Sequence, residues 1–266
     1  MTAEPPNQDQ AARLLLDLEQ AGTVIDALPA SMRPITVRHG YGIQARLAEH
    51  RGEPVVGWKI AATAAAGRRH INVDHPLAGR LFAPVVFDTD AQIRLGANRM
   101  CVAEAEIVLM LGRDLAPRPV AFTEADVADA VASIHPGLEL PDSRFADFTR
   151  VGAASLIADN ACASQFVLGP GTPVGAQLAD LADLAGLATT LLVNDEPISR
   201  GEGSDALGGP LKALTWLANT LRELDIALLR GQFVTTGVTG QPSTVAPGNR
   251  VCVDLGRYGR VQAKLV

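Results

Sequence analysis

The chain has 266 residues, a formal net charge of −6 and a pI near 5.4; 47% of its residues are hydrophobic and only 4% are aromatic. This length excludes a disulfide-stapled miniprotein and allows a sizeable core, built mainly from Ala, Val, Leu and Ile. The acidic balance argues against a general nucleic-acid binder, since phosphate contacts need a basic stripe.

Three features of the sequence bear on where the protein works. No run reaches the roughly 18 apolar residues that a membrane span requires, and the first ten residues, MTAEPPNQDQ, lack the basic and then apolar order of a secretory signal. Cys101, Cys162 and Cys252 are odd in number and widely spaced among apolar neighbours, which is typical of reduced core thiols and not of a disulfide framework or a zinc site. We therefore expect a cytoplasmic protein that binds neither membrane nor nucleic acid.

The first section of the chain is predicted to be helical. Apolar residues at helical spacing predict a helix over about 9–27 with a break at Gly22. A second helix is expected over 36–50, ending at Arg51-Gly52, where glycine suits a C-cap. We expect residues 1–54 to form an N-terminal helical section and residues 55–266 to form a β-rich catalytic domain.

After Pro54, short β-rich runs separated by Gly, Pro, Asn and Asp predict strands. Two helices interrupt them: one over about 124–134, with Thr123 as N-cap and Asp126 three residues on, and one over 210–223, with Pro210 in its first turn. The strands are expected at 55–60, 81–87, 91–95, 101–111, 165–169, 188–193, 232–237, 250–255 and 259–265. This order of elements predicts an α+β fold with a mostly β body.

The run from Cys101 to Leu111 carries two glutamates on one face of a predicted strand. Alternate residues of a strand share a face, so the odd-numbered residues form an apolar face and Glu104 and Glu106 lie together on the other. That second face is also apolar at both ends, and two carboxylates about 5–7 Å apart on a half-buried face repel each other. Either one keeps its proton or a cation lies between them. A solvent-facing edge strand with two glutamates is the alternative.

A third carboxylate follows the predicted 124–134 helix. Glu139 stands between Leu138 and Leu140, so it too is placed on apolar scaffolding. Three carboxylates without nearby Cys or His suit a hard divalent ion that keeps open positions for a substrate, which favours Mg²⁺ or Mn²⁺ and disfavours zinc. The sequence therefore predicts a metal site formed by Glu104, Glu106 and Glu139.

The segment Gly57-Trp58-Lys59-Ile60 places a lysine within a strand-like apolar run, although lysine is rarely buried without a partner. A lysine that extends from an edge strand into solvent is the simpler explanation. Beside a carboxylate cluster, however, Lys59 is a candidate acid/base or charge partner.

Other motifs indicate no chemistry of their own. The glycine-rich segment 201–209 precedes a helix but lacks the Gly-Lys-Ser/Thr ending of a phosphate-binding loop, so we expect a flexible loop near the site. His70, His75 and His135 are isolated and are expected on the surface or in loops. The sequence has no Gly-x-Ser-x-Gly elbow.

Taken together, these segments resemble the 2-keto-4-pentenoate hydratase / 4-oxalocrotonate decarboxylase group of the fumarylacetoacetate hydrolase superfamily. The matching segments lie in order between about residue 41 and residue 266. They are Gly57-Trp58-Lys59-Ile60, Val73-Asp74 with Pro76, Glu104-x-Glu106, Leu138-Glu139 with Asp142-Ser143-Arg144, Ala158-Asp159-Asn160-Ala161, Gly208 with Pro210-Leu211 and Trp216-Leu217-Ala218-Asn219, and Thr236-Gly237. Each segment is short, but the occurrence of all seven in the family's order makes the resemblance specific.

The resemblance implies a small N-terminal helical domain followed by the mixed β-roll of the superfamily, assembled as a homo-oligomer. It implies that the three glutamates hold Mg²⁺ or Mn²⁺, that Lys59 lies near the bound substrate, and that Thr236-Gly237 forms the loop that receives the substrate carboxylate. The remaining site candidates come from the matched segments: Asp74 and Asp159 as catalytic residues, and Asp142 and Arg144 as substrate-binding residues. Turn and cap chemistry is an equal alternative for Asp159.

Two positions depart from the family pattern. Hydratases commonly carry an acidic residue after the proline that corresponds to Pro76, where this chain has Leu77. The aspartate usual four residues before Thr-Gly is Gln232 here. The first departure bears on hydration more than on the metal site, because all three glutamates are present.

We rank three hypotheses for function. The first is a metal-dependent lyase that adds water to a 2-hydroxy-2,4-dienoate or its 2-oxo tautomer in the catabolism of aromatic or related compounds, with 4-oxalocrotonate-type decarboxylation as its close alternative. The second is hydrolysis of an acylpyruvate carbon–carbon bond, which would require a histidine such as His70 or His75 at the metal. The third is a non-catalytic scaffold that binds a 2-oxo acid.

Overall fold

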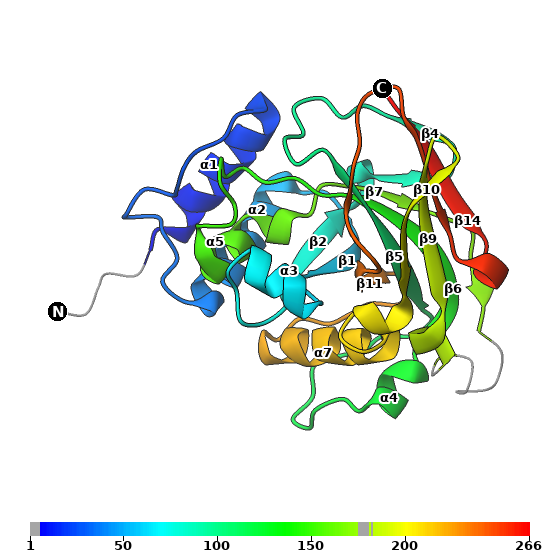
Figure 1. The fold of residues 1–266 in the computed structure, drawn as a ribbon. Helices are drawn as coiled ribbons and strands as arrows, with labels where there is room; N and C mark the ends of the chain where they lie inside the picture. The colour runs from blue at the N-terminus through cyan, green and yellow to red at the C-terminus, as the bar shows by residue number, and fades with distance from the viewer. Residues whose placement is uncertain (1–5, 175–180, 182) are drawn as a thin grey trace.

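Two β-sheets packed against each other form the body of the structure, and helices lie against it at the left and along the bottom of the view (Figure 1). The computed structural model describes residues 6–174, 181 and 183–266. Strands β5 (Val102–Leu111) and β6 (Val131–Leu140) of the larger sheet contact β9 (Ala188–Val193), β13 (Arg250–Asp254) and β14 (Arg260–Leu265) of the smaller one. The result is the mixed α+β architecture with a mostly β body that the sequence predicts.

The larger sheet runs in the order β2-β1-β11-β5-β6-β7-β3, with β12 paired to β5 and β8 paired to β6. Its remaining strands are β1 (Val55–Ala61), β2 (Leu77–Phe82), β3 (Val86–Asp88), β7 (Gln165–Leu168), β8 (Thr172–Pro173), β11 (Phe233–Val238) and β12 (Ser243–Thr244). The smaller sheet has the order β10-β9-β13-β14-β4, in which β4 is Ala91–Ile93 and β10 is Glu196–Glu202. Both sheets mix parallel and antiparallel pairs: β1 pairs with β11 in parallel and with β2 in antiparallel.

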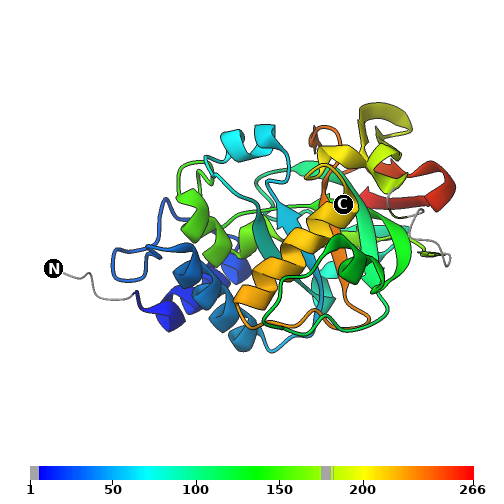
Figure 2. The same cartoon turned by 90° about the horizontal axis from the view of Figure 1, so that it is seen from below.

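The helices lie outside this body. They are α1 (Gln8–Ala21), α2 (Val37–Arg51), α3 (Ala65–His70), α4 (Glu124–Ala128), α5 (Gly152–Ala158) and α7 (Pro210–Glu223). Figure 2 shows α7 lying across the strands, with α4 beside it, and α1, α2 and α5 grouped at the N-terminal side. Within the described residues, none of the helices is both long enough and apolar enough to cross a membrane.

Both faces of β5 are buried, as expected for a central strand. Ala103, Ala105, Ile107, Leu109 and Leu111 are at most 1% exposed and belong to the main core, which also contains the inward residues of β13 and β14. The opposite face carries Glu104 and Glu106 and, further along, Val108, which packs with Phe166 and Phe233 in a separate small core. The apolar face that the alternation predicts is therefore confirmed, and the alternative of a solvent-facing edge strand is wrong.

The expected helix over 124–134 is wrong beyond its first turns. The Thr123 cap and its reciprocal bond with Asp126 form as predicted, but α4 ends at Ala128 and the chain enters β6 at Val131. β6 pairs with β5 along nearly its whole length, from Val131 opposite Leu111 to Glu139 opposite Glu104. Helix propensity in an alanine-rich run is a weak preference, and tertiary pairing with a buried neighbouring strand outweighs it.

Other expected elements are confirmed or revised in detail. The helix breaks at Gly22 and Gly52 are confirmed, since both glycines adopt left-handed conformations that end α1 and α2. The expected 81–87 strand is divided into β2, a short 3₁₀ turn and β3. Segment 201–209 is not a flexible loop: its first residues complete β10, and Gly203 is buried in a 3₁₀ turn. All three cysteines are free, and Cys162 is the buried one.

The N-terminal helices share a core with the rest of the chain. α1 and α2 contribute Leu15 and Ile43 to a cluster that also contains Phe82, Phe145 and Ala158, from beyond residue 54. In addition, the buried Gln44 amide donates hydrogen bonds to the carbonyls of Ala78 and Ile157. The expected boundary between residues 54 and 55 is therefore crossed by apolar packing and by buried hydrogen bonds.

We predict that Leu15→Ala destabilises the whole chain. Leu15 is fully buried, and removing a buried leucine side chain typically costs about 2–5 kcal/mol. The measurement is the urea midpoint of unfolding, with Arg13→Ala on the exposed side of α1 as control. Equal midpoints for the two variants would show that α1 is not part of the same cooperative unit.

Candidate active site

The curvature of the larger sheet brings Lys59 on β1 to Glu139 on β6. Two strands, β11 and β5, separate β1 from β6, so on a flat sheet their backbones would be about 14 Å apart. In the structure the Lys59 Nζ atom lies 3.0 Å from Glu139 Oε1, and both side chains are almost completely buried. Only a strongly curled sheet with inward-pointing side chains allows this contact.

Three carboxylates meet at this point. Glu104 and Glu106 come from the inner face of β5, and Glu139 stands directly opposite Glu104 on β6. One oxygen atom from each of the three carboxylates can be chosen so that all lie within 4.8 Å of one another. Glu139 is fully buried and Glu106 is 1% exposed, whereas Glu104 is half-buried. Glu104 is therefore the member of the cluster nearest to solvent.

When all its groups are ionised, the cluster carries more negative than positive charge. Burial and the neighbouring Glu139 raise the pKa of Glu104 to about 7, and the same two causes raise the pKa of Glu106 well above its ordinary value. Burial on its own lowers the pKa of Lys59, but the surrounding carboxylates, Glu139 first, raise it overall. One lysine cannot neutralise three carboxylates, so part of the cluster must hold protons unless further positive charge is bound.

The donor set fits a hard divalent cation. Neither oxygen of Glu139 takes part in a hydrogen bond within the described part of the chain, although both are buried and Lys59 forms an ion pair with one of them. Glu106 accepts one hydrogen bond, from the backbone N–H of Gly237, at 2.8 Å. Three carboxylate groups with free lone pairs at this spacing are the ligands that Mg²⁺ or Mn²⁺ takes in proteins.

Thr236 and Gly237 lie within strand β11, at an irregularity in its pairing with β5, and not on a loop as expected. The Thr236 hydroxyl donates a hydrogen bond to the carbonyl of Ile107 at 2.8 Å, so its hydrogen is not free to bind a substrate. Gly237 has φ +109°, and a Cβ there would lie 2.2 Å from the Thr63 hydroxyl. A glycine is thus required for the backbone N–H to reach Glu106.

Asp159 and Arg144 form a buried pair of their own. The Arg144 Nε donates to the Asp159 carboxylate, its Nη2 donates to the Asp159 carbonyl at 2.7 Å, and the Ser143 hydroxyl donates to the same carboxylate at 2.7 Å. Burial raises the pKa of Asp159 despite these partners. The pair fixes the segment that follows β6, and the Arg144 charge is satisfied within the chain.

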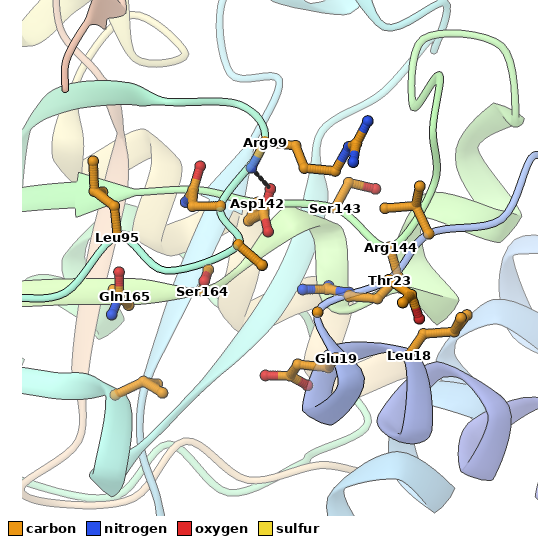
Figure 3. Close-up of a pocket in the computed structure, with 15 residues that line it drawn as sticks. Leu18, Glu19, Thr23, Leu95, Arg99, Asp142, Ser143, Arg144, Ser164 and Gln165 are labelled. Atoms are coloured by element: carbon orange, nitrogen blue, oxygen red, sulfur yellow. Dashed lines mark hydrogen bonds between the residues drawn. The ribbon is translucent and has the colours of Figure 1, made fainter. Parts of the chain in front are cut away.

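Asp142 and Asp74 are not members of the carboxylate cluster among the described residues. Asp142 accepts a hydrogen bond from the backbone N–H of Arg99 at 2.9 Å and lines a surface cavity of about 200 Å³ (Figure 3) and a second one of about 350 Å³. Neither cavity is lined by Lys59 or by the glutamates. The Asp74 side chain is 91% exposed and faces His75 at 3.5 Å. Its catalytic role stays a prediction.

The sequence did not reveal two hydroxyls that border the cluster. Thr235 stands beside Lys59 in the pairing of β1 with β11, and Thr63 contacts the backbone of Gly237. Both hydroxyls are buried and have no hydrogen-bond partner among the described residues. A threonine in an apolar strand gives no signal that its hydroxyl is unpaired, so only the structure could identify them.

Comparison with known proteins gives a consistent picture. The model of the family described as fumarylacetoacetate (FAA) hydrolase C-terminal matches residues 43–266. The chain is 34% identical to a 2-keto-4-pentenoate hydratase of Paraburkholderia xenovorans (strain LB400), over 92% of this chain and 90% of that protein. It is 33% identical to a 2-hydroxyhexa-2,4-dienoate hydratase of Comamonas testosteroni, over 91% of each.

Among solved structures, the 4-oxalocrotonate decarboxylase from Pseudomonas putida G7, complexed with magnesium and adipate, superimposes with a TM-score of 0.86. The two chains are 26% identical, and the match covers 99% of this chain and 100% of the decarboxylase. The similarity therefore includes the N-terminal helices as well as the β body.

We predict that the metal-free protein loses stability as the pH rises from about 4.5 to about 7. The pKa of Glu104 is raised from 4.5 to about 7 by burial and Glu139. Between these values the folded state binds more protons than the unfolded state, so the free energy of unfolding falls with increasing pH.

The measurement is urea unfolding of the metal-free protein between pH 5 and pH 8, compared with Glu104→Gln. The free energy of unfolding should fall less steeply with pH in the variant, which cannot titrate at this position. Added Mg²⁺ should stabilise the wild type most at pH 8. Identical pH profiles for the two proteins would contradict the assignment.

Proposed function

The chain belongs to the fumarylacetoacetate (FAA) hydrolase family, and on that premise we propose that it is a divalent-metal-dependent lyase that adds water to a 2-hydroxy-2,4-dienoate or its 2-oxo tautomer. The proposal rests on one observation: the carboxylates of Glu104, Glu106 and Glu139 form a cluster inside the protein, next to Lys59. Relatives at 33–34% identity that are named hydratases of such compounds support it.

Each residue of the cluster has a separate part in this chemistry. Glu104, Glu106 and Glu139 would hold Mg²⁺ or Mn²⁺, which when bound supplies the positive charge that stabilises a dienolate. Lys59 is protonated beside the carboxylates, which raise its pKa, and it would donate this proton to carbon as the dienolate, formed by loss of the enol O–H proton, becomes the 2-oxo tautomer. The N–H of Gly237 keeps Glu106 in place.

The substrate carboxylate needs hydrogen-bond donors. The hydrogen bonds within the structure favour donors that differ from those expected from the sequence. Arg144 is paired with Asp159, and the Thr236 hydroxyl is bound to a backbone carbonyl. The unpaired hydroxyls of Thr63 and Thr235 are better placed, since buried hydroxyls without partners gain most from a new acceptor. We propose that they contact the 2-oxo acid.

Decarboxylation of a 4-oxalocrotonate-type substrate is the second candidate. The high structural similarity to a 4-oxalocrotonate decarboxylase favours it. So does Leu77, which is fully buried, pairs with Ala61 on β1 and lies on the same face of the sheet as Lys59. An aliphatic side chain there cannot supply the acidic group that hydratases commonly carry at this position.

The acylpyruvate hydrolase hypothesis finds less support. Its base would be a histidine near the metal, but the His70 ring packs against Phe148 and His75 faces Asp74 and the carbonyl of Pro76. No histidine is part of the carboxylate cluster in the described part of the chain. Assembly into a homo-oligomer stays a proposal that rests on the resemblance alone.

A two-substrate assay tests the proposed reaction. The protein, supplied with Mg²⁺ or Mn²⁺, is given 2-hydroxypentadienoate and 4-oxalocrotonate separately, while dienol absorbance and released carbon dioxide are followed. We expect loss of the dienol without carbon dioxide, and no reaction in the presence of a chelator. Turnover of neither substrate, or turnover that is unaffected by the chelator, would refute a metal-dependent lyase.

We predict that Lys59→Met retains metal binding but loses most turnover. Methionine keeps an unbranched apolar stem, so packing changes little, whereas a general acid/base group typically contributes about 10²–10⁴-fold to the rate. Mn²⁺ binding is measured by calorimetry and kcat by the dienol assay. The control is Lys264→Met, which removes an exposed strand lysine. A Lys59→Met variant with the wild-type rate would exclude Lys59 from the chemistry.

A further inference from the structure

Three consecutive non-glycine residues beside the site adopt the left-handed conformation. The φ angles of Asn160, Ala161 and Cys162 are +55°, +52° and +60°. This conformation is unfavourable for residues with a Cβ, and it normally occurs at single positions, with asparagine the most tolerant. A run of three therefore persists only where the surroundings enforce it.

Asn160 attaches the turn to strand β2. Its Oδ1 accepts a hydrogen bond from the backbone N–H of Arg80 at 2.7 Å, and its Nδ2 donates to the carbonyl of the same residue at 2.8 Å. The turn also passes directly over Gly79, where a Cβ would lie 2.3 Å from the Asn160 carbonyl oxygen. Gly79 is the residue that pairs with Lys59 across β1 and β2.

The other end of the turn is attached to the segment after β6. The Cys162 carbonyl accepts a hydrogen bond from the N–H of Asp142 at 3.1 Å, and the N–H of Cys162 donates to the Asp159 carbonyl at 3.2 Å. Asp159 is in turn paired with Arg144. The turn is thus tied on one side to the strand beside Lys59 and on the other side to the segment that follows the strand carrying Glu139.

The group that this turn presents to the site is a backbone carbonyl. The Ala161 oxygen accepts a hydrogen bond from Lys59 Nζ at 3.1 Å, and Glu139 Oε1 lies 3.0 Å from the same nitrogen. An ammonium has three N–H groups. The Ala161 carbonyl accepts one of them and the Glu139 carboxylate attracts the ammonium as an ion-pair partner, so an N–H is left for a substrate.

We propose that Asn160 is a positioning residue that holds the Ala161 carbonyl against Lys59; the inference rests on the proposed function of Lys59. The hydrogen bond to this carbonyl opposes the electrostatic attraction between the ammonium and the three carboxylates. Without it, the ammonium would move toward the carboxylate oxygens that are proposed to bind the metal. A neutral acceptor does this without adding a fourth negative charge, and a backbone group in a tied turn cannot rotate away as a side chain could.

The test compares three variants by steady-state kinetics with the dienol. Asn160→Ala removes both hydrogen bonds and the tolerance for a left-handed backbone, so kcat should fall about 10–100-fold, part of the full acid/base contribution, while KM changes less than about threefold. Asn160→Gly keeps the left-handed conformation and should lose less.

The matched control is Asn194→Ala. Asn194 has φ +53° in the turn between β9 and β10, and its side chain accepts a hydrogen bond from the N–H of Arg250 at 2.9 Å. The control therefore loses a side-chain hydrogen bond to the backbone and an asparagine at a left-handed position, both in the smaller sheet, and its kcat should equal that of the wild type. An equal loss of kcat in both alanine variants would show a general effect on folding and would overturn the proposal.

A double-mutant cycle shows whether Asn160 acts through Lys59. Asn160→Ala introduced into Lys59→Met should lower kcat no further, whereas the same fold loss in both backgrounds would overturn the proposal. A crystal structure of Asn160→Ala gives a readout independent of activity: Lys59 should no longer contact the residue 161 carbonyl, and an unchanged contact would refute the inference. Wild-type protein that turns over no dienol would instead refute the proposed function, and the crystal structure would still decide the role of Asn160.

Discussion

Placing three carboxylates together inside a protein is the constraint on which the rest of this structure depends. Burial removes the water that would screen their repulsion, so the cluster is stable only if protons or positive charge are supplied. Among the described residues, Lys59 supplies an ammonium and Gly237 supplies a backbone N–H. The remaining imbalance explains both the raised pKa values of Glu104 and Glu106 and the fit to a divalent cation.

The fold satisfies this constraint by packing neighbouring groups directly against the backbone at a few glycines. Gly237 passes next to Thr63, and Gly79 passes beneath the turn that contains Asn160. Gly137, opposite Glu106 on β6, lies so close to the Phe166 ring that a Cβ would be 2.5 Å from it. At these positions any side chain would push strands or turns apart and would change the distances between the charged groups. These glycines are therefore part of the site, although only Gly237, through its backbone N–H to Glu106, contacts one of its charged groups.

The sequence predicts the acidic cluster well, because the evidence for it is local. Alternation along β5 places Glu104 and Glu106 on one face of the strand, independently of how the rest of the chain folds. The sequence also indicates Glu139 as a member of the cluster although it does not predict the strand that carries it. The apolar neighbours of Glu139 indicate burial in any conformation, whereas β6 is fixed only by its pairing with β5. The role of Ala161 could not be predicted, since the atom involved is a backbone oxygen. Asp159 was a candidate for catalysis, but its charge is satisfied by Arg144, a contact that depends on the tertiary fold.

The central claim is that the three glutamates of β5 and β6 form a single metal site. Anomalous diffraction at the manganese edge, from crystals of the wild-type protein grown with Mn²⁺, tests it most directly because the method locates the ion without reference to activity. The account predicts one strong peak per chain, about 2 Å from a carboxylate oxygen of each of Glu104, Glu106 and Glu139. A peak elsewhere, or a peak that contacts only one of the three residues, would contradict it.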